Sequence, residues 1–159
     1  MAEWHSRYLE STVREDIEKK MVFIGGPRQV GKTIFARIIS SNFRSPAYLN
    51  WDSRTHRHLI LKEQWSPDTD LLVFDELHKY PKWKQWIKGI WDTRRHNERI
   101  IVTGSSRMDI FRRGGDSLLG RYHYYRLHPF SLREISGMKA AGASLPKHFP
   151  ELRFEGSFA

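Results

Sequence analysis

The sequence predicts an α/β protein in which a mainly parallel sheet lies between two layers of helices. Short apolar runs recur along the chain, and segments in which apolar residues have helical spacing separate them. Strands that alternate with helices in this way pair in parallel and carry helices on both faces of the sheet. Most of the runs are apolar at every position, which is typical of strands buried on both faces.

The first half of the chain predicts three helices that alternate with three strands. A polar segment with spaced apolar residues over 7–20 predicts an amphipathic helix, and the apolar run over 21–24 predicts a buried strand. Residues 33–40 then carry four apolar side chains with the spacing of one helix face: Ile34, Phe35, Ile38 and Ile39. The elements expected next are a strand over 47–50, a helix over 56–64 and a strand over 71–74.

The second half predicts a helix with a tryptophan-rich face, two strands and short helical segments. Pro81 suits the first turn of this helix, whose apolar face carries Trp83, Trp86, Ile87, Ile90 and Trp91. Stacking of nucleic-acid bases is an alternative use of this face, but the helical spacing favours packing against the sheet. Strands over 100–102 and 122–127 follow, with a short helix over 108–113 between them and a capping box over 131–134.

Length and composition indicate a single domain. The chain has 159 residues, of which 39% are hydrophobic, and this is enough for one hydrophobic core. It contains no cysteine, which excludes disulfides and thiolate metal sites. No apolar run reaches the ~18 residues that a membrane helix needs. The N-terminus also lacks the pattern of a signal peptide, so we expect a cytoplasmic protein that makes no membrane contact.

The basic charge is concentrated in one segment. The formal net charge is +9, and the stretch from Lys79 to Arg133 contains 13 Lys and Arg residues against four acidic residues. The rest of the chain is balanced. A solvated basic surface is the simpler interpretation of this pattern. The second interpretation is a binding face for nucleic acid or for an acidic partner.

The strongest motif is a glycine-containing loop after the first predicted strand. Residues 26–33 read Gly-Pro-Arg-Gln-Val-Gly-Lys-Thr and match G-x-x-x-x-G-K-[ST]. In such a loop the backbone N–H groups point at phosphate oxygens, and the next helix adds its positive N-terminal end. Lys32 is expected to reach the β- and γ-phosphates, and the hydroxyl of Thr33 to ligate Mg²⁺. The predicted cofactor-binding residues are Gly26, Pro27, Arg28, Gln29, Val30, Gly31, Lys32, Thr33 and Ile34.

Two carboxylates follow the strand predicted over 71–74. Asp75 and Glu76 come at the carboxyl end of this strand, where ligands bind in open α/β sheets. Asp75 is expected to hold Mg²⁺, directly or through water, and Glu76 to orient and deprotonate an attacking water. A carboxylate in that place favours hydrolysis of a nucleoside triphosphate over phosphoryl transfer to a metabolite. His78 is expected to pack or cap rather than to touch the site.

Several motifs in order resemble a known family. Besides the phosphate loop, they are Tyr-Leu-Asn-Trp-Asp at 48–52, Leu-Leu-Val-Phe-Asp-Glu-Leu-His-Lys-Tyr-Pro-Lys-Trp at 71–83, Thr-Gly-Ser-Ser at 103–106, Gly-Arg at 120–121 and Leu-His-Pro-Phe-Ser at 127–131. Together they resemble the AAA-type P-loop ATPases of bacteria and archaea that lie near the STAND class. The resemblance covers residues 21–135. It implies a three-layer α/β/α P-loop NTPase fold with strand order 5-1-4-3-2, and ATP as the nucleotide.

The resemblance also implies roles for polar residues beyond the two main motifs. Thr103, or Ser105 just beyond it, would be the polar sensor after the fourth strand. Arg121 would be an arginine finger that reaches a phosphate in its own subunit or in a neighbouring subunit of a homo-oligomer. The alternatives are a hydroxyl that closes a turn for Thr103 and a surface arginine in a basic stretch for Arg121.

The resemblance further implies how the chain is divided. Family members continue with a winged-helix-like segment and often a nuclease-like domain. We therefore expect an N-terminal helical segment over 1–20, an ATPase domain over 21–137 and a tail over 138–159, without the C-terminal domains. The prediction for the whole chain is a domain that binds ATP and hydrolyses it with Mg²⁺. The alternative is a nucleotide-binding switch or assembly module with little turnover, in contact with nucleic acid through the basic surface.

Overall fold

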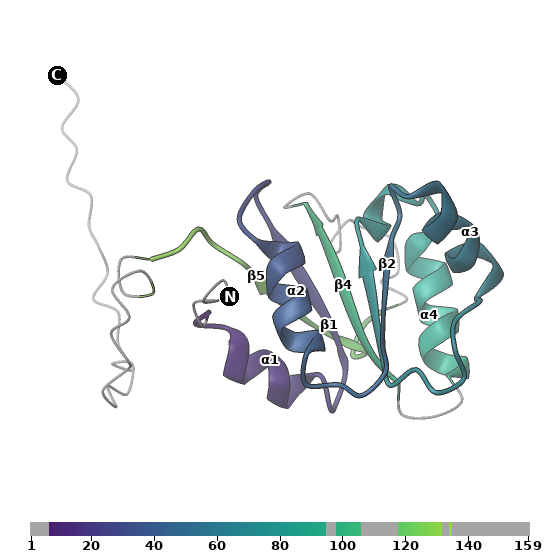
Figure 1. Ribbon diagram of the computed structural model, residues 1–159, viewed down its shortest axis with the longest axis horizontal. Helices are drawn as coiled ribbons and strands as arrows, with labels where there is room; N and C mark the ends of the chain where they lie inside the picture. Colours follow the sequence, from purple (N-terminus) through teal and green to yellow (C-terminus); the bar gives the residue numbers. More distant parts are fainter. Residues whose placement is uncertain (1–6, 95–97, 106–117, 132–133, 135–159) are drawn as a thin grey trace, which may run out of the picture.

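Five strands pair side by side in the computed structural model, which describes residues 7–94, 98–105, 118–131 and 134 (Figure 1). The strands are β1 (Met21–Gly26), β2 (Pro46–Asn50), β3 (Leu71–Asp75), β4 (Arg99–Ser105) and β5 (Tyr122–Arg126). Their order in the sheet is β2-β3-β4-β1-β5, and every neighbouring pair is parallel. This is the order 5-1-4-3-2 counted from the opposite edge, so the predicted sheet is confirmed.

Helices cover both faces of this sheet. In the described residues the helices are α1 (Glu10–Asp16), α2 (Lys32–Ser40), α3 (Arg54–Lys62) and α4 (Trp83–Thr93), and a 3₁₀ turn, η1, spans Leu77–Lys79. Figure 1 shows α1 and α2 on one face and α3 and α4 on the other, which confirms the three-layer α/β/α arrangement. Within the described part of the chain, every helix is too short or too polar to cross a membrane.

The core has two halves, one on each face of the sheet. Side chains alternate along a strand, so Met21 and Phe23 of β1 belong to the cluster under α3 and α4. Val22 and Ile24, between and after them, belong to the cluster under α1 and α2. All four side chains are fully buried. The continuous apolar runs in the sequence therefore reflect strands that bury both faces.

The tryptophan-rich face of α4 packs on the core, as the sequence predicts. Trp83, Ile87 and Ile90 are buried in the cluster beneath α4. Trp86 meets Phe74 of β3 edge to face, with ring centroids 5.2 Å apart and an interplanar angle of 84°. These rings are engaged with the sheet, which confirms core packing as their role.

The predicted elements differ from the observed ones mainly at their ends. The helix predicted over 7–20 is shorter, and the helix predicted over 56–64 begins earlier because the Ser53 hydroxyl accepts a hydrogen bond from His56 N–H at 3.4 Å and caps it. The capping box is present: Ser131 N–H donates to Glu134 Oε2 at 2.8 Å, and Glu134 N–H donates to Ser131 Oγ at 3.2 Å. The helix predicted over 108–113 and the tail predicted over 138–159 lie outside the described residues.

Candidate functional site

The loop between β1 and α2 lies at the carboxyl edge of the sheet. Its first glycine, Gly26, packs so closely on the segment after β5 that a Cβ atom would collide with the carbonyl oxygen of Leu127. Its second glycine, Gly31, has a φ of +89°, in the left-handed region that favours glycine. One glycine of the motif is therefore required by packing and the other by the turn that leads into α2.

Lys32 is a buried lysine in the first turn of α2, with only 7% of its surface exposed. Its ammonium donates to two carbonyl oxygens of the loop itself, that of Gly26 at 3.0 Å and that of Pro27 at 2.6 Å. Burial lowers the pKa of this ammonium, and the carboxylates of Glu76 and Asp75 partly oppose the shift. The positive charge is thus held inside the curl of the loop.

Asp75, at the end of β3, is the centre of a cluster of hydroxyl groups, and it is 3% exposed. Thr33 donates to its Oδ2 atom at 2.9 Å, and Tyr48 donates to the same oxygen. Thr103 donates to Oδ1. The three hydroxyl groups come from α2, β2 and β4, so the cluster ties the helix after the phosphate loop to the carboxyl ends of three neighbouring strands.

The register of the sheet explains why these groups meet. Asp75 pairs with Thr103 on β4. Because side chains alternate, Asp75 points to the same face as Val73, and Thr103 to the same face as Ile101. That face is the one that α2 covers, and Tyr48 packs on it as well. Thr33, in the first turn of α2 on that face, therefore reaches the Asp75 carboxylate.

Glu76 shares a hollow with the phosphate loop. Its φ of +58° lies in the left-handed region, which is uncommon for a residue with a side chain. Its N–H donates to the carbonyl oxygen of Thr103 at 3.1 Å and holds this turn against β4. The hollow measures about 320 Å³, and besides Glu76 it is lined by Arg28, Gln29, Gly31, Lys32, Thr33 and Ile34.

The Glu76 carboxylate has a lysine and a histidine beside it. The ammonium of Lys79 lies 3.2 Å from Glu76 Oε2 and 2.5 Å from Asp52. His78 Nε2 lies 3.8 Å from Glu76 Oε2 and 3.2 Å from the hydroxyl of Ser105. Burial lowers the pKa of His78 against the opposing effect of Glu76, which favours the neutral form of the ring. His78 therefore contacts Ser105 and lies near Glu76 without lining the hollow.

Arg121 lies at the other end of the sheet. Its carbonyl oxygen accepts a hydrogen bond from the N–H of Met21, the first residue of β1, whereas the phosphate loop follows the last residue of β1. Its guanidinium Nε donates to Asp92 Oδ1 at 2.9 Å. The structure brings Lys32, Thr33, Asp75, Glu76 and Thr103 to one edge, but it does not bring Arg121 to them within the chain.

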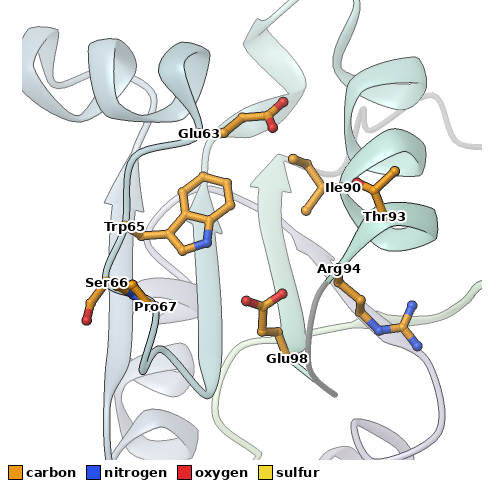
Figure 2. A pocket seen from close by; sticks show the side chains of 8 residues that line it. All are labelled: Glu63, Trp65, Ser66, Pro67, Ile90, Thr93, Arg94 and Glu98. Carbon is orange, nitrogen blue, oxygen red and sulfur yellow. The ribbon is translucent and has the colours of Figure 1, made fainter.

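A second hollow, of about 400 Å³, opens at the amino ends of β3 and β4 (Figure 2). Figure 2 shows Trp65 and Glu98 turned toward this space and Arg94 turned away from it. The Arg94 guanidinium donates to the carbonyl oxygen of Trp91 at 2.5 Å and lies over the Trp91 ring. None of the residues predicted to bind nucleotide lines this hollow, so the hollow at the phosphate loop is the candidate site.

Two residues of the site were not predicted from the sequence. Tyr48 was expected as part of a strand and of a family motif, but with no role of its own. Burial raises its pKa to about 12, helped by its hydrogen bond to Asp75, so the phenol remains a donor. Arg7 is 4% exposed and donates to the carbonyl oxygen of Val30 at 3.1 Å and to Glu134 at 2.9 Å. Tyr48 lies near the carboxyl end of β2, the strand next to β3. Once the strand order is known, this position indicates that its hydroxyl lies close to Asp75.

Solved structures confirm the fold. The chain is similar to the Orc1 protein of Aeropyrum pernix in complex with DNA, with a TM-score of 0.56 and 14% identity over 83% of this chain and 48% of that chain. It is also similar to a double mutant of the Pif1 helicase from Bacteroides, with a TM-score of 0.53 and 11% identity over 80% of this chain and 42% of that chain. The chain thus spans about half of those proteins or less.

Structures at this low identity show the fold alone, so the family of the chain is assigned from its match to a sequence family. No protein with a curated description matches the chain. The family described as the AAA domain matches residues 18–136, which include the phosphate loop, the hydroxyl cluster and Glu76. This match spans most of the sequence, and the chain therefore belongs to the AAA domain family.

Proposed function

We propose that this domain binds ATP with Mg²⁺ and hydrolyses the bond between the β- and γ-phosphates. The observation that carries the proposal is the hydrogen bond of 2.9 Å between Thr33 and Asp75, beside the hollow that Glu76 shares with the phosphate loop. Mg²⁺ prefers oxygen ligands, and a hydroxyl with a carboxylate is a donor set that fits it. Thr33 and Asp75 would hold the ion, which supplies charge neutralisation at the phosphate oxygens when bound.

In this proposal each polar side chain of the site has a separate task. The ammonium of Lys32, inside the loop, binds phosphate oxygens. The Glu76 carboxylate accepts a proton from the attacking water. Thr103 positions Asp75 through its hydrogen bond, and Ser105 contacts His78, whose Nε2 atom lies 3.8 Å from the Glu76 carboxylate. These contacts favour Ser105 as the polar sensor near the water and Thr103 as a support for the metal ligand.

A single-turnover assay tests the proposal. The chain, in excess over Mg-ATP, should release phosphate, and Glu76→Gln should bind ATP with the wild-type affinity but release none. Glu15→Gln, an exposed change on α1, serves as the matched control and should behave as wild type. Absence of ATP binding by the wild-type chain would overturn the whole proposal.

The same assay separates hydrolysis from the alternative, a nucleotide-binding switch. A switch needs the loop and the hydroxyl cluster but no working base. Tight ATP binding without phosphate release by the wild-type chain would therefore favour the switch. Phosphate release that Glu76→Gln leaves unchanged would remove Glu76 from the role of base.

A further inference from the structure

One oxygen of the Asp75 carboxylate has both of its lone pairs engaged. Thr33 donates to Oδ2 at 2.9 Å, and Tyr48 donates to it as well. An ionised carboxylate offers about four lone-pair positions, two on each oxygen. Thr103 takes one of those on Oδ1. Among the described residues, these hydrogen bonds leave Asp75 one acceptor position, and it lies on Oδ1.

The Tyr48 hydroxyl is held in this place from both sides. Its strand pairs in register with β3, with Tyr48 opposite Val73. The Tyr48 ring packs on the core under α2, and the Arg37 guanidinium lies over it, 5.2 Å from the ring centroid. The phenol is therefore a fixed part of the cluster rather than a surface group that swings freely.

The two common divalent cations use carboxylates differently. Mg²⁺ requires near-octahedral geometry, keeps several waters and takes single oxygens, whereas Ca²⁺ takes six to eight oxygens and often binds both oxygens of one carboxylate. Binding through both oxygens requires an open lone pair on each. We propose that Tyr48 closes Oδ2 of Asp75 to metal and so selects Mg²⁺ over Ca²⁺. This inference rests on the proposed function, because it concerns the same metal site.

The test compares metals by binding rather than by turnover. Mn²⁺ is bound to the chain together with a non-hydrolysable ATP analogue and followed by electron paramagnetic resonance, and Mg²⁺ or Ca²⁺ then displaces it. The wild-type chain should prefer Mg²⁺. Tyr48→Phe keeps the ring and its packing but removes the hydroxyl, and it should move the ratio of the two displacement constants toward Ca²⁺ by about tenfold, which corresponds to about 1.4 kcal/mol. Tyr48→Leu also lacks the hydroxyl and should move the ratio in the same direction.

A matched variant sharpens this test. Tyr125→Phe removes a phenol that donates to Asp16, away from the site, and should leave the ratio unchanged. An unchanged ratio in both Tyr48 variants, with Mn²⁺ bound, overturns this inference alone. Failure of the wild-type chain to bind Mn²⁺ with the analogue overturns the proposed function with it.

Discussion

Thr33 donates a hydrogen bond to Asp75 across 2.9 Å, although 42 residues separate the two in the chain. This contact joins the phosphate loop to the end of β3. The cluster around it is buried, and a buried carboxylate is stable only when its oxygens are hydrogen-bonded. The position of the loop and that of the acidic strand end are therefore coupled, and we expect a substitution at one to shift the other.

Replacing Lys32 tests the phosphate loop directly. Its ammonium is buried and already makes two hydrogen bonds inside the loop. A hydrogen bond to a charged group is worth roughly 1.5–3 kcal/mol, so Lys32→Ala, which removes one such bond to a phosphate oxygen, should weaken ATP binding by about 10- to 150-fold. A titration with a fluorescent ATP analogue measures this. Lys62→Ala, an exposed lysine on α3, is the control, and equal affinity in both variants would contradict the assignment.

Gly26→Ala should destabilise the fold. The added Cβ would collide with the carbonyl oxygen of Leu127 and lie 3.3 Å from Val30 Cγ1. Overpacking of this kind costs roughly 1–3 kcal/mol in the free energy of unfolding. Gly89→Ala is the matched control, because nothing lies within 4 Å of its Cβ position in α4, and it should stabilise by roughly 0.5–1 kcal/mol. Denaturant unfolding measures the free energy of unfolding of both variants. Equal values would contradict the expected collision and show that the loop moves to accommodate the added Cβ atom at Gly26.

Glu134 makes stability depend on acid pH. Burial by itself raises the pKa of this carboxyl, but hydrogen bonds from Ser131, Tyr8 and Arg7 outweigh burial and lower the pKa from 4.5 to about 2. A carboxyl whose pKa is lower in the folded state stabilises the fold above its unfolded pKa. That contribution is fully present above about pH 4.5 and is lost as the pH falls toward 2.

Glu134→Gln is expected to reveal this contribution. The variant should be less stable than the wild type at pH 7, by roughly 1–3 kcal/mol, because the Arg7 guanidinium loses its charged partner. The difference should shrink as the pH falls from 4.5 toward 2. Urea unfolding at a series of pH values measures it, with Glu15→Gln on α1 as the control. A stability difference that does not vary with pH would contradict the pKa assigned to Glu134.

The site residues that can be predicted from the sequence are those that belong to short local motifs. Lys32 and Thr33 belong to one loop motif, and Asp75 and Glu76 follow one apolar run, so a short window contains each pair. Tyr48 was not predicted because its role depends on which strand lies beside β3, and this depends on the whole sheet. Arg7 was not predicted because its partner Glu134 is 127 residues away, and no local pattern marks such a pair.

The basic stretch from Lys79 to Arg133 makes a separate prediction. If it binds nucleic acid, affinity for duplex DNA should fall steeply with salt, with a slope of about −0.9 for each phosphate contact. Replacing Lys82, Lys84 and Lys88 with glutamine removes three of its charges and should make the slope shallower. Fluorescence anisotropy over a salt series measures this. Binding that does not depend on salt, or that is absent near physiological salt, would favour a merely solvated surface.

Replacing Arg121 tests whether the catalytic site is complete within one chain or is completed by a neighbouring subunit. It lies at the amino edge of the sheet beside Asp92, away from the phosphate loop, so its predicted role as an arginine finger requires a neighbouring subunit. A partly exposed ion pair contributes little to stability, so Arg121→Ala should fold and bind ATP normally.

Turnover per chain should rise with protein concentration in the wild type, as assembly completes the site, and should stay low in Arg121→Ala. Asp92→Ala removes the same ion pair but keeps the arginine, and it should retain the rise. Wild-type turnover by Arg121→Ala at every concentration would assign the arginine to the surface ion pair alone.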